Sequence, residues 1–200
     1  WCACSMSISM RSMPEPYRAG ATFLFLGGVR LGEMSRLAWS DVEMRSGVEG
    51  ADRFVAARVW SRKGKHKKVR WRTVPFNQRM KQVMQKQHEA TKGEGLVFPA
   101  PGGGMWDRNN FYRGWREACR KREIFDFTPH DARHTFASHL VQRGVSLRAV
   151  ADLLGHASLD MVMRYSHLAP SHLEDVVGVL DTHSDTSLTQ WVKTPEFEGV

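Results

Sequence analysis

The amino-acid sequence predicts a mainly helical α+β fold with one small antiparallel sheet. The chain has 200 residues, of which 42% are hydrophobic, and this suits one globular domain with a sizeable core. Most apolar residues recur at the spacing of buried or amphipathic helices. Two runs, 53–60 and 69–76, instead have the composition of strands, and the basic turn "SRKGKHKK" between them predicts a hairpin.

Apolar spacing and capping residues place the helices along the chain. The segment 96–104, "LVFPAPGGG", interrupts them as a short extended piece and a loop. In chain order we expect helical segments at 17–26, 31–42, 77–90, 106–124, 128–144, 146–155, 158–168 and 171–181. The residues expected to begin or end them are the caps Asn77, Thr128 and Ser146, Pro129 in a first turn, and Gly27, Gly28, Gly144 and Gly155 at ends.

We expect three parts in the chain. Residues 1–16 form an irregular N-terminal segment, residues 17–181 form the domain, and residues 182–200 form a polar, flexible tail. The first residue is Trp1 rather than Met, which favours a fragment, a processed product or an incomplete gene.

The charge of the chain points to a polyanionic partner. Lys and Arg total 29 against 21 for Asp and Glu, which gives a formal net charge of +8. Nucleic acid is the commonest partner for such an excess. The cysteines, Cys2, Cys4 and Cys119, form no disulfide framework or zinc spacing, so a reducing cytoplasm fits best. No apolar run is long enough to span a membrane, and no signal peptide is recognisable.

The stretch "TPHDARHTFASHLVQRG", 128–144, gathers His130, Arg133 and His134 within five residues and adds His139. A metal site would need a third suitable ligand, and the arginine on the same helical face would repel a cation. A solvated basic face explains Arg133 but not a cluster in the first turn. Because helix N-termini favour anions, a phosphate fits this cluster best.

Two further stretches contain candidate functional residues. "LLGHASLDMVMRYSHL" places His156 after a helix-ending glycine and Tyr165 nine positions later, and a tyrosine hydroxyl can attack a phosphodiester. "LGGVRLGEMSRL" places Arg30 after a glycine pair, with Glu33 able to hydrogen-bond the backbone or hold an arginine. Taken alone, each of these residues is more often a packed or surface residue than a ligand.

Together, these residues resemble the catalytic domain of the tyrosine recombinases, the phage-integrase family. The resemblance covers about residues 17–180 and rests on four elements in order. They are Gly28-Val29-Arg30 with Glu33, His130 with Arg133, Leu154-Gly155-His156, and Tyr165. It implies the integrase-type catalytic fold, and hence that residues 17–181 are a catalytic domain.

The resemblance implies a role for each residue. Tyr165 would attack a DNA phosphate and form a 3′-phosphotyrosyl bond, while Arg30 and Arg133 would hold the non-bridging oxygens. His130 would assist as a base toward Tyr165, and His156 would hydrogen-bond the phosphate. No cofactor or metal is implied, and double-stranded DNA bound by a homotetramer is the implied partner. His134 and His139 are expected to be packing or supporting residues.

A hairpin lysine would protonate the leaving 5′-oxygen. The position favours Lys63, with Lys65 as the alternative, because the interval from Lys63 to Pro75 is longer than the family pattern. The other lysines of the turn would only contact the DNA backbone. The separate helical domain that such recombinases usually carry has no counterpart in these 200 residues, which again favours a truncated chain.

Three other functions remain open. A non-enzymatic helix-turn-helix protein would explain the charge and the pattern of 146–167, but leaves Arg30, His130 and Arg133 as coincidences. A type IB topoisomerase-like enzyme would use similar chemistry. A metal-dependent nuclease would be exposed by chelators.

Overall fold

The computed structural model describes residues 13, 15–45, 54–63, 68–121 and 123–169, with only the backbone of Lys63 and Lys68. Within these residues no helix is long and apolar enough to cross a membrane. The helices are α1 (Tyr17–Gly27), α2 (Leu31–Met34), α3 (Gln78–Thr91), α4 (Arg108–Arg120), α5 (Pro129–Gln142), α6 (Leu147–Leu154) and α7 (Asp160–Met163). The strands are β1 (Val42–Met44), β2 (Phe54–Lys63) and β3 (Lys68–Pro75), and two 3-10 turns are η3 (Trp39–Asp41) and η4 (Ser166–Leu168).

The strands form one antiparallel sheet in the order β1-β2-β3. The predicted hairpin is confirmed: β2 pairs with β3, with Val59 opposite Arg72 and Trp60 opposite Trp71. Since side chains alternate between faces, Val59 and Arg72 share the face that meets the helices, while Trp60 and Trp71 share the opposite face. The short strand β1 adds an edge that the sequence pattern did not reveal.

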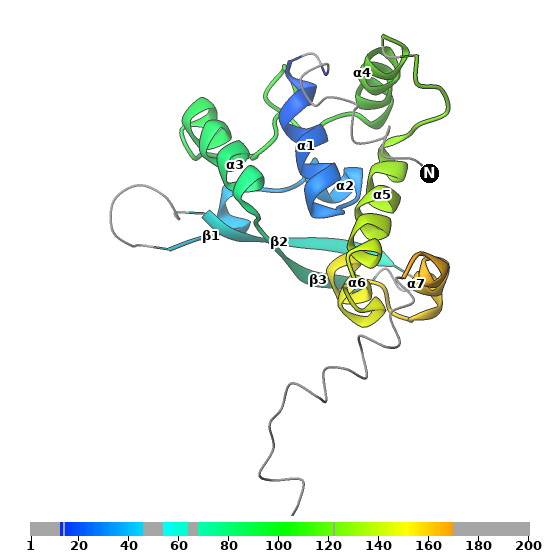
Figure 1. Cartoon of the computed structure of the whole chain (residues 1–200). Coiled ribbons are helices and arrows are strands. Elements are labelled where there is room, and N and C mark those ends of the chain that lie inside the picture. The colour runs from blue at the N-terminus through cyan, green and yellow to red at the C-terminus, as the bar shows by residue number, and fades with distance from the viewer. Residues whose placement is uncertain (1–12, 14, 46–53, 64–67, 122, 170–200) are drawn as a thin grey trace, which may run out of the picture. The chain divides into compact units, whose positions relative to one another are not determined.

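The helices cover one face of the sheet. In Figure 1, α1 lies between α3 and α5, with the sheet below them. The main core joins these elements through buried aromatic side chains such as Phe23, Phe111 and Trp115. A second, smaller cluster of buried residues joins α5, α6 and the turn after α7, and includes Leu154 and Tyr165. Tyr165 is therefore packed into the fold, with 6% of its surface exposed.

The predicted N-caps are confirmed by hydrogen bonds. The side chain of Asn77 accepts from the backbone N–H of Met80, and that of Ser146 accepts from Ala149. Thr128 and Asp131 form a reciprocal capping box, with Pro129 in the first turn of α5. This cap fixes where α5 begins, and so fixes which residues of α5 face the interior.

Two expected helices are shorter than their spacing indicated. After α2 the chain leaves the α-helix, because the backbone of Leu37 and Trp39 pairs with the segment 95–97 instead. The segment 158–168 forms α7 and η4 as two short pieces rather than one helix. The expected helix at 171–181, the tail 182–200 and nearly all of the segment 1–16 lie outside the described residues.

Gly28 is the position where the fold most needs glycine. It ends α1 in the left-handed region with φ 57°, and a Cβ there would overlap the ring of Phe136. Gly28→Ala should therefore lower the free energy of unfolding by about 2–5 kcal/mol, from left-handed strain and overpacking combined. Urea denaturation followed by circular dichroism measures this.

The matched control is Gly144→Ala. Gly144 also has a positive φ, 79°, but a Cβ there would meet nothing within 4 Å. Gly144→Ala should therefore lower the free energy of unfolding only through the left-handed strain, by about 1–2 kcal/mol. Equal losses at the two positions would show that the contact with Phe136 does not constrain this turn.

Candidate active site

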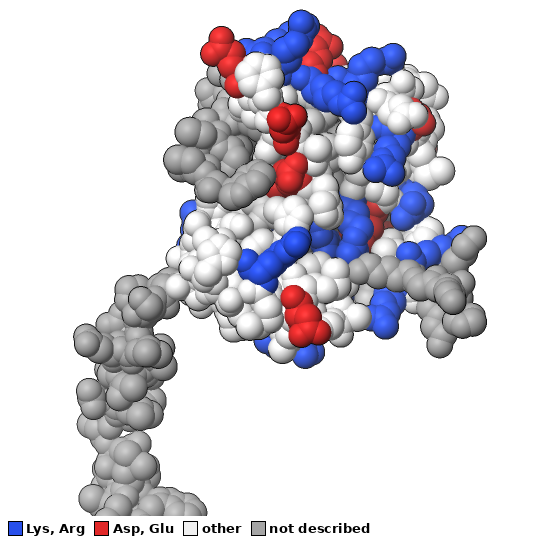
Figure 2. All heavy atoms as spheres, turned by 90° about the vertical axis from the view of Figure 1, so that its right-hand side faces the viewer, with Lys and Arg blue, Asp and Glu red and all other residues white. Residues whose placement is uncertain are grey.

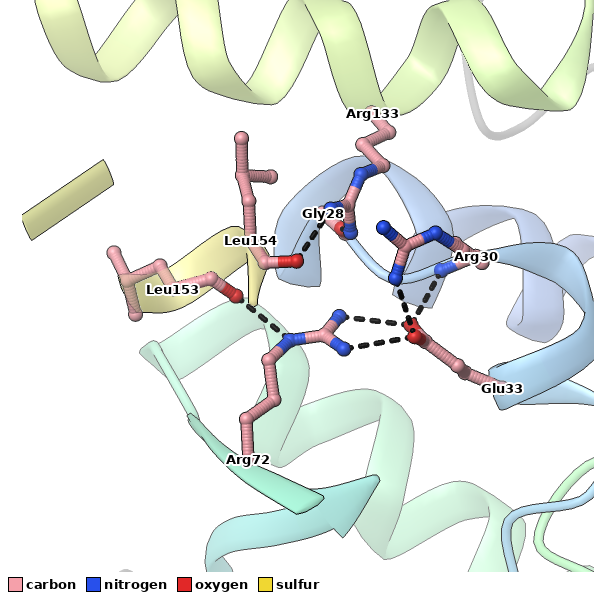
Figure 3. A network of polar contacts seen from close by, with 7 residues as sticks. All are labelled: Gly28, Arg30, Glu33, Arg72, Arg133, Leu153 and Leu154. Carbon is pink, nitrogen blue, oxygen red and sulfur yellow. Dashed lines mark hydrogen bonds and ion pairs between the residues drawn. The ribbon is translucent and has the colours of Figure 1, made fainter. Parts of the chain in front are cut away.

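A buried carboxylate, Glu33, holds two arginines from distant parts of the chain. Arg30 donates from its backbone N–H and from Nη1 to the two oxygens of Glu33, each at 2.8 Å. Arg72 on β3 approaches the same carboxylate with both terminal nitrogens, at 2.9 and 2.8 Å. The predicted roles of Glu33, binding the backbone and holding an arginine, are both seen in Figure 3.

The electrostatics of this pairing keep Glu33 ionised. Glu33 is 3% exposed, and burial by itself would raise the pKa of its carboxyl group. The hydrogen bonds and positive charges of Arg72 and Arg30 outweigh burial and lower that pKa from 4.5 to about 2. The carboxylate is thus a permanent anion at any physiological pH.

Arg133 comes to the same place from α5. Its guanidinium donates to the carbonyl of Gly28, at 2.6 Å, and to the carbonyl of Leu154 at the end of α6. Burial, followed by the charges of Arg30 and Arg72, lowers the pKa of Arg133 from 12.5 to about 9, so it remains charged at neutral pH. Figure 3 shows Arg30 and Arg72 paired with Glu33, and the guanidinium of Arg133 beside them on the carbonyls of Gly28 and Leu154.

The charges of this cluster do not balance. Arg30, Arg72 and Arg133 contribute three positive charges, while Glu33 contributes one negative charge, so the group carries a net charge of +2. The mutual repulsion that lowers the pKa of Arg133 would be relieved by an anion. Arg30 keeps 26% of its side chain exposed, which leaves it accessible to such an anion.

Tyr165 is held by a histidine of α5. Its hydroxyl shares a hydrogen bond of 2.5 Å with Nδ1 of His134. The ring of His134 meets the ring of His130 edge to face, with centroids 4.7 Å apart. His130 itself is exposed and lines a cavity of about 340 Å³ together with Arg30, Arg108 and Tyr112. His134 therefore does more than pack, whereas His139 contacts Arg143 at the far end of the helix.

The remaining predicted site residues are His156, which follows α6, and the hairpin lysine. Gly155 ends α6 in the left-handed conformation, and the backbone N–H of His156 donates to the carbonyl of Ala151. The side chain of Arg72 passes against Gly155 and donates to the carbonyl of Leu153, so the His156 turn is tied to β3. Lys63 ends β2, and its side chain lies outside the described residues, as does Lys65.

Reasoning from the sequence missed Arg72 and gave His134 only a packing or supporting role. Arg72 stands in "VRWRTV", where the alternation of the strand did place it on the face of the buried Val74, a signal that could have singled it out. His134 is next to Arg133, but its contact with Tyr165 depends on how α5 and α7 pack. In the part of the chain that is described, no group of three or more His, Cys, Asp or Glu is placed to hold a metal ion.

Comparisons with known proteins agree on one family. The sequence matches the model of the phage integrase family over residues 5–172. It is similar to the integrase of Salmonella phage P22, at 29% identity over 197 residues, which cover 92% of this chain and 48% of that protein. It is also similar to the tyrosine recombinase XerC of Pelobacter propionicus, at 31% identity over 163 residues, which cover 80% of this chain and 50% of that protein. The chain thus spans about half the length of these relatives.

Solved structures show the same fold. The crystal structure of XerA recombinase superposes with a TM-score of 0.66 at 22% identity, covering 90% of this chain and 62% of that one. The catalytic domain of bacteriophage HP1 integrase gives a TM-score of 0.62 at 23% identity, covering 88% of this chain and 92% of that one. The fold class predicted from the sequence is therefore confirmed.

The pairing of Glu33 predicts a specific loss of stability in acid. Its pKa is about 2 when folded and 4.5 when unpaired. A lowered folded pKa stabilises the protein above pH 4.5, and this contribution, about 3 kcal/mol in total, is lost as the pH falls from there toward 2. Glu33→Gln should lower the stability at pH 7 by about 3–5 kcal/mol, because it leaves buried arginines unpaired.

Urea titrations from pH 7 to pH 3 measure both effects. The acid-dependent loss should be much smaller in Glu33→Gln than in the wild type. Glu117→Gln is the control, because Glu117 pairs with Lys121 on an exposed face of α4 and should change little. A Glu33→Gln variant with the stability and acid slope of the wild type would contradict the assigned role of Glu33.

Proposed function

The chain belongs to the phage integrase family, and from this we propose that it cuts and rejoins DNA as a site-specific tyrosine recombinase. The observation that carries the proposal is the net positive cluster of Arg30, Arg72 and Arg133 around Glu33. Such a cluster suits the charge that develops on a phosphodiester during phosphoryl transfer. Tyr165 lies close to this cluster: burial raises the pKa of its hydroxyl, and the charges of Arg164 and Arg133 oppose that shift.

The reaction follows from the chemistry of the residues. Arg30 and Arg133 bind the non-bridging oxygens of the scissile phosphate, for which guanidinium groups are well shaped. The Tyr165 oxygen attacks phosphorus and forms a 3′-phosphotyrosyl bond, while the 5′-oxygen leaves with a proton from Lys63, or from Lys65 in the alternative assignment. His130 takes the proton of the Tyr165 hydroxyl as that oxygen attacks, and His156 hydrogen-bonds the phosphate. Rejoining reverses these steps, with no cofactor or metal.

The surface chemistry supports duplex DNA as the partner. On the face presented by α4, α5 and α7, Lys and Arg gather at the α4 end among a few acidic groups, and more lie across the rest of the face (Figure 2). On the outer face of the sheet, Arg58 stacks on Trp71 and Arg62 on Trp60, at 5.0 and 5.5 Å. Such groups bind the DNA backbone without reading its sequence. We propose that the protein acts in the cytoplasm, as a homotetramer on DNA.

Tyr165→Phe tests this function. The substitution removes one oxygen from a packed ring, so the fold should persist and DNA binding should remain. Nicked suicide duplexes, tiled across the DNA that flanks the gene, should trap a covalent adduct with the wild type and none with Tyr165→Phe. Mass spectrometry of the digested adduct should find the nucleotide on the Tyr165 peptide.

Tyr112→Phe is the matched control, because the chain has three tyrosines and Tyr112 lies on α4. It should still form the adduct. Excess chelator should not prevent the adduct either, since no step uses a metal. An adduct that survives Tyr165→Phe, or cleavage that needs one added metal ion, would overturn the proposal.

A further inference from the structure

The outer face of the β2–β3 hairpin carries two tryptophans and the arginines that stack on them. Trp60 and Trp71 lie opposite each other in the strand register, with ring centroids 6.3 Å apart. Arg58 lies over Trp71 at 5.0 Å, and Arg62 lies over Trp60 at 5.5 Å, both within the range of cation–π contacts. We call these four residues the Arg–Trp surface.

We propose that the Arg–Trp surface binds unpaired DNA, with Trp71 stacking on a base and the arginines binding neighbouring phosphates; this inference rests on the proposed function. The strand it binds is the one that cleavage releases with a free 5′-hydroxyl. Rejoining to a different duplex requires this strand to leave its complement, so the nucleotides next to the cut become unpaired. Bases inside an intact duplex stack on one another, and only unpaired bases are open to stacking on a side chain.

Trp71 is the more open of the two tryptophans. Trp60 is partly buried, and its ring is covered by Arg36 at 4.4 Å as well as by Arg62. Trp71 keeps 49% of its surface exposed, and Val69, which lies two residues earlier on the same face, keeps 46%. Together they offer apolar area on which a base can lie. Such stacking accepts any base, because every base has a π-face.

The charges of the surface suit the phosphates of a DNA strand. Neither "FVAARVWSRK" in β2 nor "KVRWRTVP" in β3 contains an Asp or Glu, and Glu43 of β1 lies opposite Ala56, away from the hairpin turn. Arg58 and Arg62 are exposed, and in the described part of the chain no carboxylate pairs with either. A guanidinium stacked on an indole keeps its N–H donors at its edge, where phosphate oxygens can accept from them.

The hairpin places this surface beside the candidate acid of the proposed reaction. β2 ends at Lys63, which would protonate the 5′-oxygen, and Trp60 precedes it by three residues. Three residues of a strand span about 10 Å, which matches about three stacked nucleotides at ~3.4 Å each. A released strand that begins at the 5′-oxygen therefore reaches Trp71, which lies opposite Trp60.

Fluorescence anisotropy with labelled oligonucleotides tests the surface without any cleavage. The probes are an oligothymidine strand and an abasic strand of the same length, which keeps the phosphates and lacks the bases. Trp71→Leu keeps an apolar side chain but removes the aromatic face. It should weaken binding of the thymidine strand by about 5–150-fold, the scale of one stacked base, and should leave binding of the abasic strand nearly unchanged. Trp71→Phe restores a ring and should recover most of the lost affinity.

The wild type supplies a readout that needs no substitution, because it should bind the abasic strand about 5–150-fold more weakly than the thymidine strand. Phe125→Leu is the matched control. Phe125 is 74% exposed but follows α4, so this change should leave the binding of both strands as in the wild type. Arg58→Ala removes a phosphate contact. It should weaken both strands and reduce the slope of log affinity against log salt by about 0.7.

A rejoining assay tests the role of the surface in strand transfer. The covalent adduct is first formed on the suicide duplex and is then mixed with a strand that carries a 5′-hydroxyl, so that only rejoining is measured. For Trp71→Leu, the strand concentration that gives half-maximal rejoining should rise by about 5–150-fold. Phe125→Leu should keep the wild-type concentration.

The outcomes separate this inference from the proposed function. If the wild type forms the adduct but Trp71→Leu binds the thymidine strand as the wild type does, the inference is overturned while the proposed function stands. A loss that is equally large for the abasic strand or for an intact duplex overturns it as well, because base stacking is then not involved. A Trp71→Leu adduct that rejoins at the wild-type strand concentration refutes the role in strand transfer. If the wild type forms no adduct on any duplex, the proposed function fails and the strand-transfer role fails with it.

Discussion

The buried carboxylate of Glu33 is the constraint on which the rest of the site depends. Placing several guanidinium groups together inside a protein is costly, because each loses hydration and repels the others. Glu33 offsets this cost by accepting hydrogen bonds from Arg30 and from both terminal nitrogens of Arg72. The single negative charge of Glu33 does not neutralise the three positive charges of Arg30, Arg72 and Arg133. The excess positive charge is what makes the place suitable for a phosphate.

The same interactions join elements that are far apart in sequence. Arg72 connects β3 to α2 through Glu33, and to α6 through the carbonyl of Leu153. Arg133 connects α5 to the end of α1 and to the end of α6. Gly28, which ends α1 in the left-handed conformation, supplies the carbonyl that Arg133 uses. Stability and the arrangement of the site therefore depend on the same side chains, so substitutions here need the matched controls described above.

The sequence predicted those features that depend on local chemistry. Capping residues such as Thr128 located the helices, and the alternation of "VRWRTV" located β3, because these signals act over a few residues. The pattern of Arg30, His130, Arg133, His156 and Tyr165 pointed to one site through a family resemblance. The alternation of the strand indicates that Arg72 faces inward, but its pairing with Glu33 and the contact between His134 and Tyr165 depend on tertiary packing, which local patterns do not reveal. The short strand β1 was not predicted, because three residues carry too little periodicity to indicate a strand.

The central claim is that this cluster exists to neutralise a scissile phosphate. Arg30 is the best probe, because its side chain is partly exposed and Arg72 still pairs with Glu33 when Arg30 is removed. The most direct measurement compares Arg30→Ala on a suicide duplex with an ordinary phosphate and on one with a neutral methylphosphonate at the cleavage position. The account predicts that the variant fails on the phosphate and forms the Tyr165 adduct on the methylphosphonate, where no charge needs to be balanced. An Arg30→Ala variant that cleaves the ordinary phosphate at the wild-type rate, or that fails equally on both duplexes while remaining folded, would contradict it.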